Sequence, residues 1–519
     1  MNRSMKPHAE QVGMLLTVAA LLTTGLCPVF AGPPRVFRVI YNQDCSHVFG
    51  QVAKQGRAIK PDDIDRMVDE VVDGGAELML INPNGQIGRV NYPSRAWQPY
   101  WDKREKIGGG LAQMKHLADW GHDYLGLSLA RCRGRGIAAG VSLRMNDTHN
   151  TPWPDRPVHS DFWRAHPEWW IEAAYRPQGD YKTVRAMDYR QPAVREYFLR
   201  LIREIVTDYS PDVLELDFMR FPLYFPPDVA RECNDVMSGF VKEVRALLGK
   251  DRLLYVRAPV TVASGLEYGL DYAAWAREGL IDGVTVAAHF NTAWDIDMAS
   301  WRRALGGRVA LYACVESSAY SPDGGRNYVM GLDERLLRGF AAANRGQGAD
   351  GIYLFNFFCA REWTGREPLF AALAQLADPA MLVGKPKTYC LTAAAGVWHL
   401  PESDGPLQVP RTIGPRESQA FSLLMGAEPP GLSVDVEVVT AAAADPANVS
   451  LHANEQLAGE PTPGKAAPGA ANSLVFRATT SMFRGGFNSL VIRNDGPPLT
   501  VRAVVVRVRE QPHAVPAGD

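Results

Sequence analysis

The sequence of 519 residues lacks several features that mark other classes of protein. It has no block of basic residues and a formal net charge of only -2, so we expect neither nucleic acid nor an anionic membrane surface as its main partner. Its seven cysteines follow no metal-binding spacing. After residue 31, no apolar run is long enough to cross a membrane. The sequence therefore predicts a globular protein without a resident metal or cofactor.

Motifs of several enzyme classes are also missing. The first predicted strand runs into Asn42-Gln43-Asp44 rather than a Gly-rich turn, which argues against a nucleotide-binding doubly wound sheet. There is no Gly-x-Ser-x-Gly motif of the serine hydrolases. The first strand also lacks a His-x-His pair, so a metal-dependent barrel hydrolase would need mostly carboxylate ligands, and we do not favour that class.

The first 31 residues have the pattern of a secretory signal peptide. Arg3 and Lys6 precede an apolar run from Met14 to Leu26, and Val29-Phe30-Ala31 offers small residues at the usual cleavage positions. We expect an exported protein, periplasmic or extracellular, whose mature chain begins near Gly32.

From residue 32 to about 380, short β-type runs alternate with amphipathic helical patterns. Eight such alternations are typical of an α/β protein with a (β/α)8 barrel, the TIM-barrel fold. Long insertions follow the second and third runs, at the strand ends where such barrels build their sites. The predicted strands are Val36–Asn42, Glu77–Asn82, Ile137–Arg144, Val213–Asp217, Leu253–Arg257, Val284–His289, Val309–Glu316 and Ile352–Asn356.

The composition changes after the barrel. We expect a linker over residues 381–404, a small all-β sandwich over 405–510 and a disordered tail over 511–519, because short alternating runs are separated there by Gly, Pro and Asn turns. The stretch from Phe483 to Gly496 resembles the closing strands of galactose-binding-like accessory modules. Packing against the barrel and binding sugar are both open roles for this domain.

Polar residues stand at the end of nearly every predicted strand. Because side chains alternate between the two faces of a strand, the outward Leu214 and Leu216 place Glu215 and Asp217 inside the barrel. We expect Glu215, one layer deeper, to pair with Arg144 or Arg257 in a structural role. A ring of converging polar groups costs stability unless its members bind a ligand or one another. The ring comprises Asn42, Asn82, Arg144, Asp217, Arg257, His289, Glu316 and Asn356.

Three blocks of sequence resemble one family. The first block is the element His166-Pro167-Glu168-Trp169. The second begins at Met187-Asp188-Tyr189 and ends with the segment from Asp212 to Pro222. The third is the approach to strand six from Trp275 to Asp282, and all three are similar to blocks of the family-10-like glycosyl hydrolases. Phe218-Met219 and Phe221 depart from the family's usual residues. The resemblance implies a TIM-barrel glycoside hydrolase that acts on a poly- or oligosaccharide.

Hydrolysis of a glycosidic bond needs a proton donor and a second carboxylate. Asp217 and Glu316 can supply this pair, and we favour Asp217 as nucleophile or charge stabiliser and Glu316 as acid/base, although the reverse assignment stays open. Arg257 would keep the strand-four carboxylate ionised. Substrate contacts are expected, against packing as the alternative, from Asn42, Asn82, Arg144, Arg220, Arg257, His289, Trp163, Trp294 and Asn356.

Two further alternatives remain. Glu267, Asp295 and Asp297 are reserve candidates for the acid. A non-catalytic carbohydrate-binding barrel would keep the Asn and aromatic lining, while its carboxylates served only structural pairing.

Overall fold

The structure is a computed structural model of the chain. It describes residues 34–44, 47–103, 108–175, 182–288, 292–316, 318–320, 329–357, 369–392, 408–464 and 472–509. The predicted signal peptide, residues 393–404 of the predicted linker, the tail and His289 lie outside these residues.

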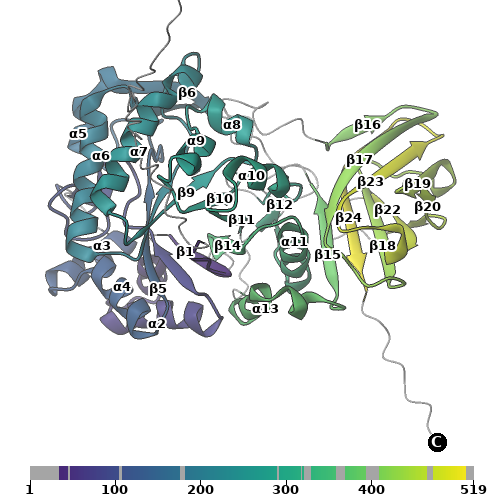
Figure 1. The fold of residues 1–519 in the computed structure, drawn as a ribbon, viewed down its shortest axis with the longest axis horizontal. Helices are drawn as coiled ribbons and strands as arrows, with labels where there is room; N and C mark the ends of the chain where they lie inside the picture. Colours follow the sequence, from purple (N-terminus) through teal and green to yellow (C-terminus); the bar gives the residue numbers. More distant parts are fainter. Residues whose placement is uncertain are drawn as a thin grey trace, which may run out of the picture. The chain divides into compact units, whose positions relative to one another are not determined.

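Eight parallel strands close into a barrel, as predicted (Figure 1). Each strand pairs with its neighbours along the chain, and the last pairs with the first, where Asn42 lies opposite Phe355. The observed bounds differ from the expected ones by at most three residues. The strands are β1 (Val39–Gln43), β2 (Leu78–Ile81), β5 (Ala138–Arg144), β8 (Val213–Asp217), β9 (Leu253–Ala258), β10 (Gly283–Val286), β11 (Ala310–Glu316) and β14 (Gly351–Phe355).

The predicted alternation of side chains is confirmed on the central strands. Leu214 and Leu216 belong to the large apolar cluster that includes the surrounding helices. Tyr255, Tyr312 and Cys314 belong instead to a separate cluster inside the barrel. This alternation sends Glu215, Asp217, Arg257 and Glu316 into the interior.

Helices and two insertions surround the strands. The insertion after β2 carries β3 (Arg89–Val90) and β4 (Gln98–Pro99), and the insertion after β5 carries α5 (Asp161–Ala165) and the hairpin of β6 (Trp170–Tyr175) and β7 (Lys182–Met187). Both follow strand carboxyl ends, so they lie at the end of the barrel where sites are built. The helices that flank the strands include α1 (His47–Lys54), α2 (Pro61–Asp73), α3 (Gly109–Asp119), α4 (Tyr124–Gly134), α6 (Pro192–Glu204), α7 (Asn234–Leu248), α8 (Val262–Glu267), α9 (Tyr272–Arg277), α10 (Met298–Leu305), α11 (Glu334–Gly346) and α13 (Leu373–Ala377).

The C-terminal region forms two antiparallel sheets around their own apolar cluster. One sheet contains β15 (Lys387–Leu391), β16 (Arg411–Ile413), β18 (Ser433–Thr440), β21 (Thr462–Pro463), β22 (Asn472–Thr479) and β24 (Leu499–Val508). The other contains β17 (Glu417–Met425), β19 (Val449–Ala453), β20 (Gln456–Leu457) and β23 (Gly486–Asn494).

Strand β15 corrects the expected domain boundary. It lies within the segment predicted to be linker, yet it pairs with β24 and completes the first sheet. It also packs on barrel helix α11, where a Cβ on Gly339 would lie only 2.1 Å from the carbonyl oxygen of Thr388. Gly339 is therefore required for the close approach of these two elements.

None of the helices that the structure describes is long and apolar enough to cross a bilayer.

Candidate active site

The strand-end ring gathers at one end of the barrel interior. The seven members that the structure describes are at most 5% exposed. Parallel strands end on the same rim, so the side chains at their carboxyl ends converge on the mouth of the barrel. His289, the eighth member, lies outside the described residues.

Asp217 is held by a buried ion pair. Nη1 of Arg257 donates to its Oδ2 at 2.9 Å, and the backbone N–H of Met219 donates to its Oδ1 at 3.0 Å. Asp217 and Arg257 are register partners on adjacent strands, and the guanidinium lies 4.0 Å from the ring centre of Phe355. Burial alone would lower the pKa of Arg257, but the charge of Asp217 and of other neighbours raises it well above its ordinary value.

Glu316 has the opposite environment. Its side chain is buried, and its Oε1 has no hydrogen-bond partner. Burial raises the pKa of Glu316 to about 8, although the charges of Arg257 and Arg220 oppose the shift. The side chain is therefore protonated near neutral pH and can donate a proton.

Glu215 lies one layer below Asp217, and its partners differ from the expected ones. Its Oε1 accepts hydrogen bonds from the hydroxyl groups of Ser142 and Tyr353, each at 2.7 Å, rather than from an arginine. Burial and the nearby charge of Asp217 raise the pKa of Glu215 to about 7. Glu215 is buried, as expected, but Arg257 acts on it through charge rather than through a hydrogen bond.

A chain of alternating charges continues around the rim. Arg144 donates to Asp44 at 2.6 Å and to Asp147 at 2.8 Å, and Nη2 of Arg220 lies 3.9 Å from Asp44. Burial would raise the pKa of Asp147, but the charges of His149 and Arg144 lower it far below its ordinary range. Neither aspartate was predicted from the sequence, although Asp44 closely follows β1 and Asp147 closely follows β5.

The three asparagines of the ring differ in their contacts. Asn42 donates to the hydroxyl of Tyr353 at 2.7 Å, which is a structural contact. Asn82 donates to the carbonyl of Ser142, but its Oδ1 is buried without a hydrogen-bond partner. Oδ1 of Asn356 is also buried without one, and its backbone has a φ of 52°. Asn82 and Asn356 therefore offer hydrogen-bond acceptors at the mouth.

The two tryptophans expected to contact the sugar are packed against other side chains of the protein instead. The ring of Trp163 is buried and stacked against two others. Its centre lies 4.3 Å from the ring centre of His159 and 4.2 Å from that of Trp170. Trp294 is buried with its ring against Phe340 of α11 at 5.7 Å. Both belong to the large apolar cluster, so the structure does not present them as open surfaces for stacking a sugar.

The reserve acids contact other residues. Glu267 is exposed and forms an ion pair with Arg231. Asp297 accepts the backbone N–H of Ser300 at 2.9 Å and so caps α10. The carboxyl group of Asp295 accepts from Gln408 at 3.1 Å, and burial raises its pKa. We therefore keep Glu316 as the candidate acid.

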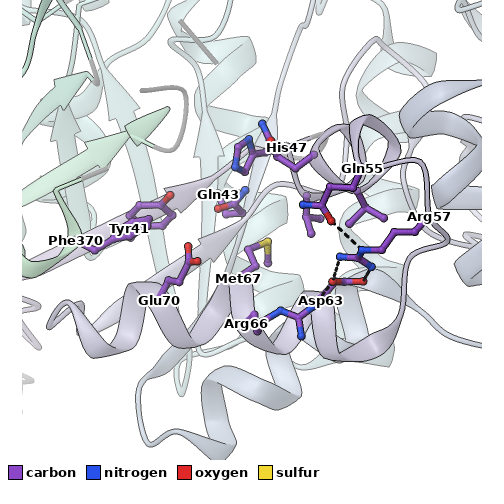
Figure 2. A pocket seen from close by; sticks show the side chains of 13 residues that line it. Tyr41, Gln43, His47, Gln55, Arg57, Asp63, Arg66, Met67, Glu70 and Phe370 are labelled. Atoms are coloured by element: carbon purple, nitrogen blue, oxygen red, sulfur yellow. Dashed lines mark hydrogen bonds and ion pairs between the residues drawn. The ribbon is translucent and has the colours of Figure 1, made fainter. Parts of the chain in front are cut away.

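A separate pocket lies outside the barrel wall. Its volume is about 150 Å³, and Figure 2 shows Gln43, His47 and Glu70 around it. The lining comes from β1, α1, α2, the segment between these two helices and Phe370, and it includes no member of the strand-end ring. This pocket is distinct from the candidate active site.

Within the described ranges, no group of three or more His, Cys, Asp or Glu side chains is arranged to hold a metal ion. The carboxylates at the mouth are paired with arginines instead, apart from Glu215 and Glu316.

Comparison with known proteins finds similar solved structures but assigns the chain to no family. No protein-family model matches the chain, and the search of curated proteins gives no match. Among solved structures, the chain is similar to α-L-fucosidase isoenzyme 2 from Paenibacillus thiaminolyticus, with a TM-score of 0.43, 11% identity and coverage of 66% of this chain and 49% of that chain. This chain thus spans about half the length of that fucosidase.

Two further solved structures are similar over most of both chains. A bacterial fucosidase has a TM-score of 0.39, with 9% identity over 88% of this chain and 94% of that one. A noncanonic maltogenic α-amylase from Thermotoga neapolitana has a TM-score of 0.37, with 11% identity over 87% and 98%. At these values the likeness carries no argument about activity, and the barrel itself follows from the strand pairing. The resemblance to family-10-like glycosyl hydrolases stays a prediction from the residues quoted above.

Proposed function

We propose that the protein is a glycoside hydrolase that cleaves glycosidic bonds in a poly- or oligosaccharide. The observation that carries this proposal is the contrast between two buried carboxyl groups at one barrel mouth. Asp217 is paired with Arg257, whereas Glu316 is held in its protonated form by burial. A carboxylate held by a buried arginine and a protonated carboxyl group beside it suit the base and acid roles of such a reaction.

The chemistry follows from these environments. Glu316 donates its proton to the leaving oxygen of the glycosidic bond as that bond breaks. Asp217, as nucleophile or charge stabiliser, faces the positive charge that develops on the sugar ring. Water then adds its oxygen to the anomeric carbon, and the proton that this step releases restores the acid form of the site. The partnerless acceptors of Asn82 and Asn356 then receive hydrogen bonds from sugar hydroxyl groups, which offsets the cost of their burial.

A substrate screen tests the proposal. The protein and its Asp217→Asn variant are incubated with a panel of polysaccharides and aryl glycosides, and released sugar or aryl alcohol is measured. We expect the protein to cleave at least one member and the variant to cleave none at a comparable rate. Retention on a glycan without cleavage of any member would favour a carbohydrate-binding barrel instead.

We also propose that the protein is exported. The support is the charged start, the apolar run and the small residues at Val29 and Ala31. N-terminal sequencing of protein isolated from its native cell should give a start near Gly32. An intact residue 1–31 segment on a cytosolic protein would refute this assignment.

A further inference from the structure

A hydrogen-bonded layer lies beneath Asp217. Glu215 precedes Asp217 by two residues on β8, so it points into the same interior about 7 Å deeper. Its Oε1 accepts from Ser142 and Tyr353, and the Tyr353 hydroxyl accepts from Asn42. One oxygen of this carboxyl group is thus held by hydroxyl groups from two other strands.

The second oxygen of Glu215 is not held. Its Oε2 and the Nε of Arg257 are both buried without a hydrogen-bond partner. Arg257 meanwhile uses Nη1 for Asp217 and points Nη2 at the sulfur of Cys314, 3.9 Å away. Burial and the charge of Asp217 raise the pKa of Glu215, and the charge of Arg257 opposes this shift, so Glu215 and Arg257 lie within electrostatic reach. A donor and an acceptor that both lack partners therefore lie close to the Asp217–Arg257 pair.

We propose that Glu215 is a positioning residue that controls how firmly Arg257 holds Asp217. This inference rests on the proposed function. While Glu215 keeps its proton, the guanidinium is committed to Asp217. When Glu215 releases its proton to solvent, the new carboxylate competes with Asp217 for Arg257, and Asp217 loses the orientation that the reaction needs.

Other groups around Glu215 do not account for such a change between pH 6 and 9. The pKa of Tyr353 is raised well above its ordinary value by burial and by the charge of Glu215, so its hydroxyl stays a donor. Burial likewise raises the pKa of the Cys314 thiol far above its usual range. Glu316 also titrates in this window, but its contribution to the pH dependence of the rate is removed by a substrate whose leaving group needs no proton. The titratable or charged groups from the packed strands are Asp217 on β8, Tyr255 and Arg257 on β9, Cys314 on β11 and Tyr353 on β14.

A kinetic experiment isolates the effect of Glu215. Dinitrophenyl glycosides have a leaving group that departs without protonation, so their hydrolysis does not need the proton of Glu316. On such a substrate, the protein should lose kcat as Glu215 ionises near pH 7, and Glu215→Gln should remove this alkaline limb. Ser142→Ala removes a hydrogen bond that favours the ionised form, so its limb should move to higher pH. An unchanged limb in Glu215→Gln, or a shift to lower pH in Ser142→Ala, would overturn the proposal.

Crystal structures at pH 6 and pH 9 test the same proposal without a substrate. In the unmodified protein, Arg257 should come within hydrogen-bond distance of Glu215 at pH 9 but not at pH 6. In Glu215→Gln, it should stay on Asp217 at both values. An Arg257 that does not move in the unmodified protein refutes the role of Glu215, whether or not a glycoside is cleaved. Movement of Arg257 in a protein that cleaves no glycoside would refute the proposed function alone.

Discussion

Replacing Glu316 with Gln gives a test of the site that needs no substrate. The side chain keeps its size and hydrogen-bonding capacity but can no longer ionise. In the folded protein the pKa of Glu316 rises from its ordinary 4.5 to about 8. One pKa unit corresponds to about 1.4 kcal/mol, so ionising this buried group costs the folded state roughly 5 kcal/mol at high pH.

The sign of the effect follows from where the proton is bound. Between pH 4.5 and about 8 the unfolded chain has released the proton of Glu316, whereas the folded protein still holds it. The free energy of unfolding of the unmodified protein therefore falls as pH rises through this window. Glu316→Gln lacks this loss, so its stability relative to the unmodified protein should increase by up to about 5 kcal/mol from pH 4.5 to pH 9.

Urea unfolding followed by tryptophan fluorescence measures this difference. Unfolding curves are recorded at a series of pH values from 4.5 to 9 for three proteins: the unmodified protein, Glu316→Gln and the control Glu267→Gln. Glu267 is an exposed carboxyl group paired with Arg231, so its variant should track the unmodified protein. A stability difference between Glu316→Gln and the unmodified protein that stays constant with pH would refute the argument that burial holds Glu316 protonated.

Three further outcomes are expected. Arg257→Met leaves the buried charge of Asp217 without its partner and should lower the free energy of unfolding by about 3–5 kcal/mol; a loss below about 1 kcal/mol in urea unfolding would show that the pair is not buried as described. Trp163→Ala should cost about 3–5 kcal/mol of stability while the KM of the folded fraction stays unchanged, and a large rise in KM would restore Trp163 to the sugar subsite. Glu267→Ala and Asp297→Ala should each keep near-normal turnover, and a loss of several orders of magnitude in either would move the acid to that residue.

The barrel was predictable because its signal is local. Outward and inward side chains alternate along each strand, and the runs Val213–Asp217 and Leu253–Arg257 place a charged residue at or near the strand end. The same alternation correctly predicted that Glu215 points inward. Strand β15 was missed because it lies outside the alternating runs of the sandwich, and its pairing with β24 depends on residues more than 100 positions away.

Apart from the contact between Asp217 and Arg257, which was expected, the partners of the site residues could not be predicted in this way. Asn42 and Tyr353 are 311 residues apart in the chain, and Tyr353 is 138 residues from Glu215. Such contacts depend on how the strands are staggered around the closed barrel, which no local pattern encodes. Trp163 was misplaced for a different reason. The sequence does not reveal whether the face of an indole ring is open or covered by other side chains, and here it is covered.

The central claim is that Asp217 and Glu316 carry out the chemistry, and the turnover of Asp217→Ala and Glu316→Ala tests it most directly. Both variants are assayed on a glycoside that the unmodified protein cleaves, with thermal unfolding to confirm that each is folded. We predict a loss of about 10²–10⁴-fold in kcat for Glu316→Ala, most of it recovered when the leaving group needs no proton, and at least as large a loss for Asp217→Ala with every leaving group. Near-normal turnover in both folded variants would contradict the assignment of the active site.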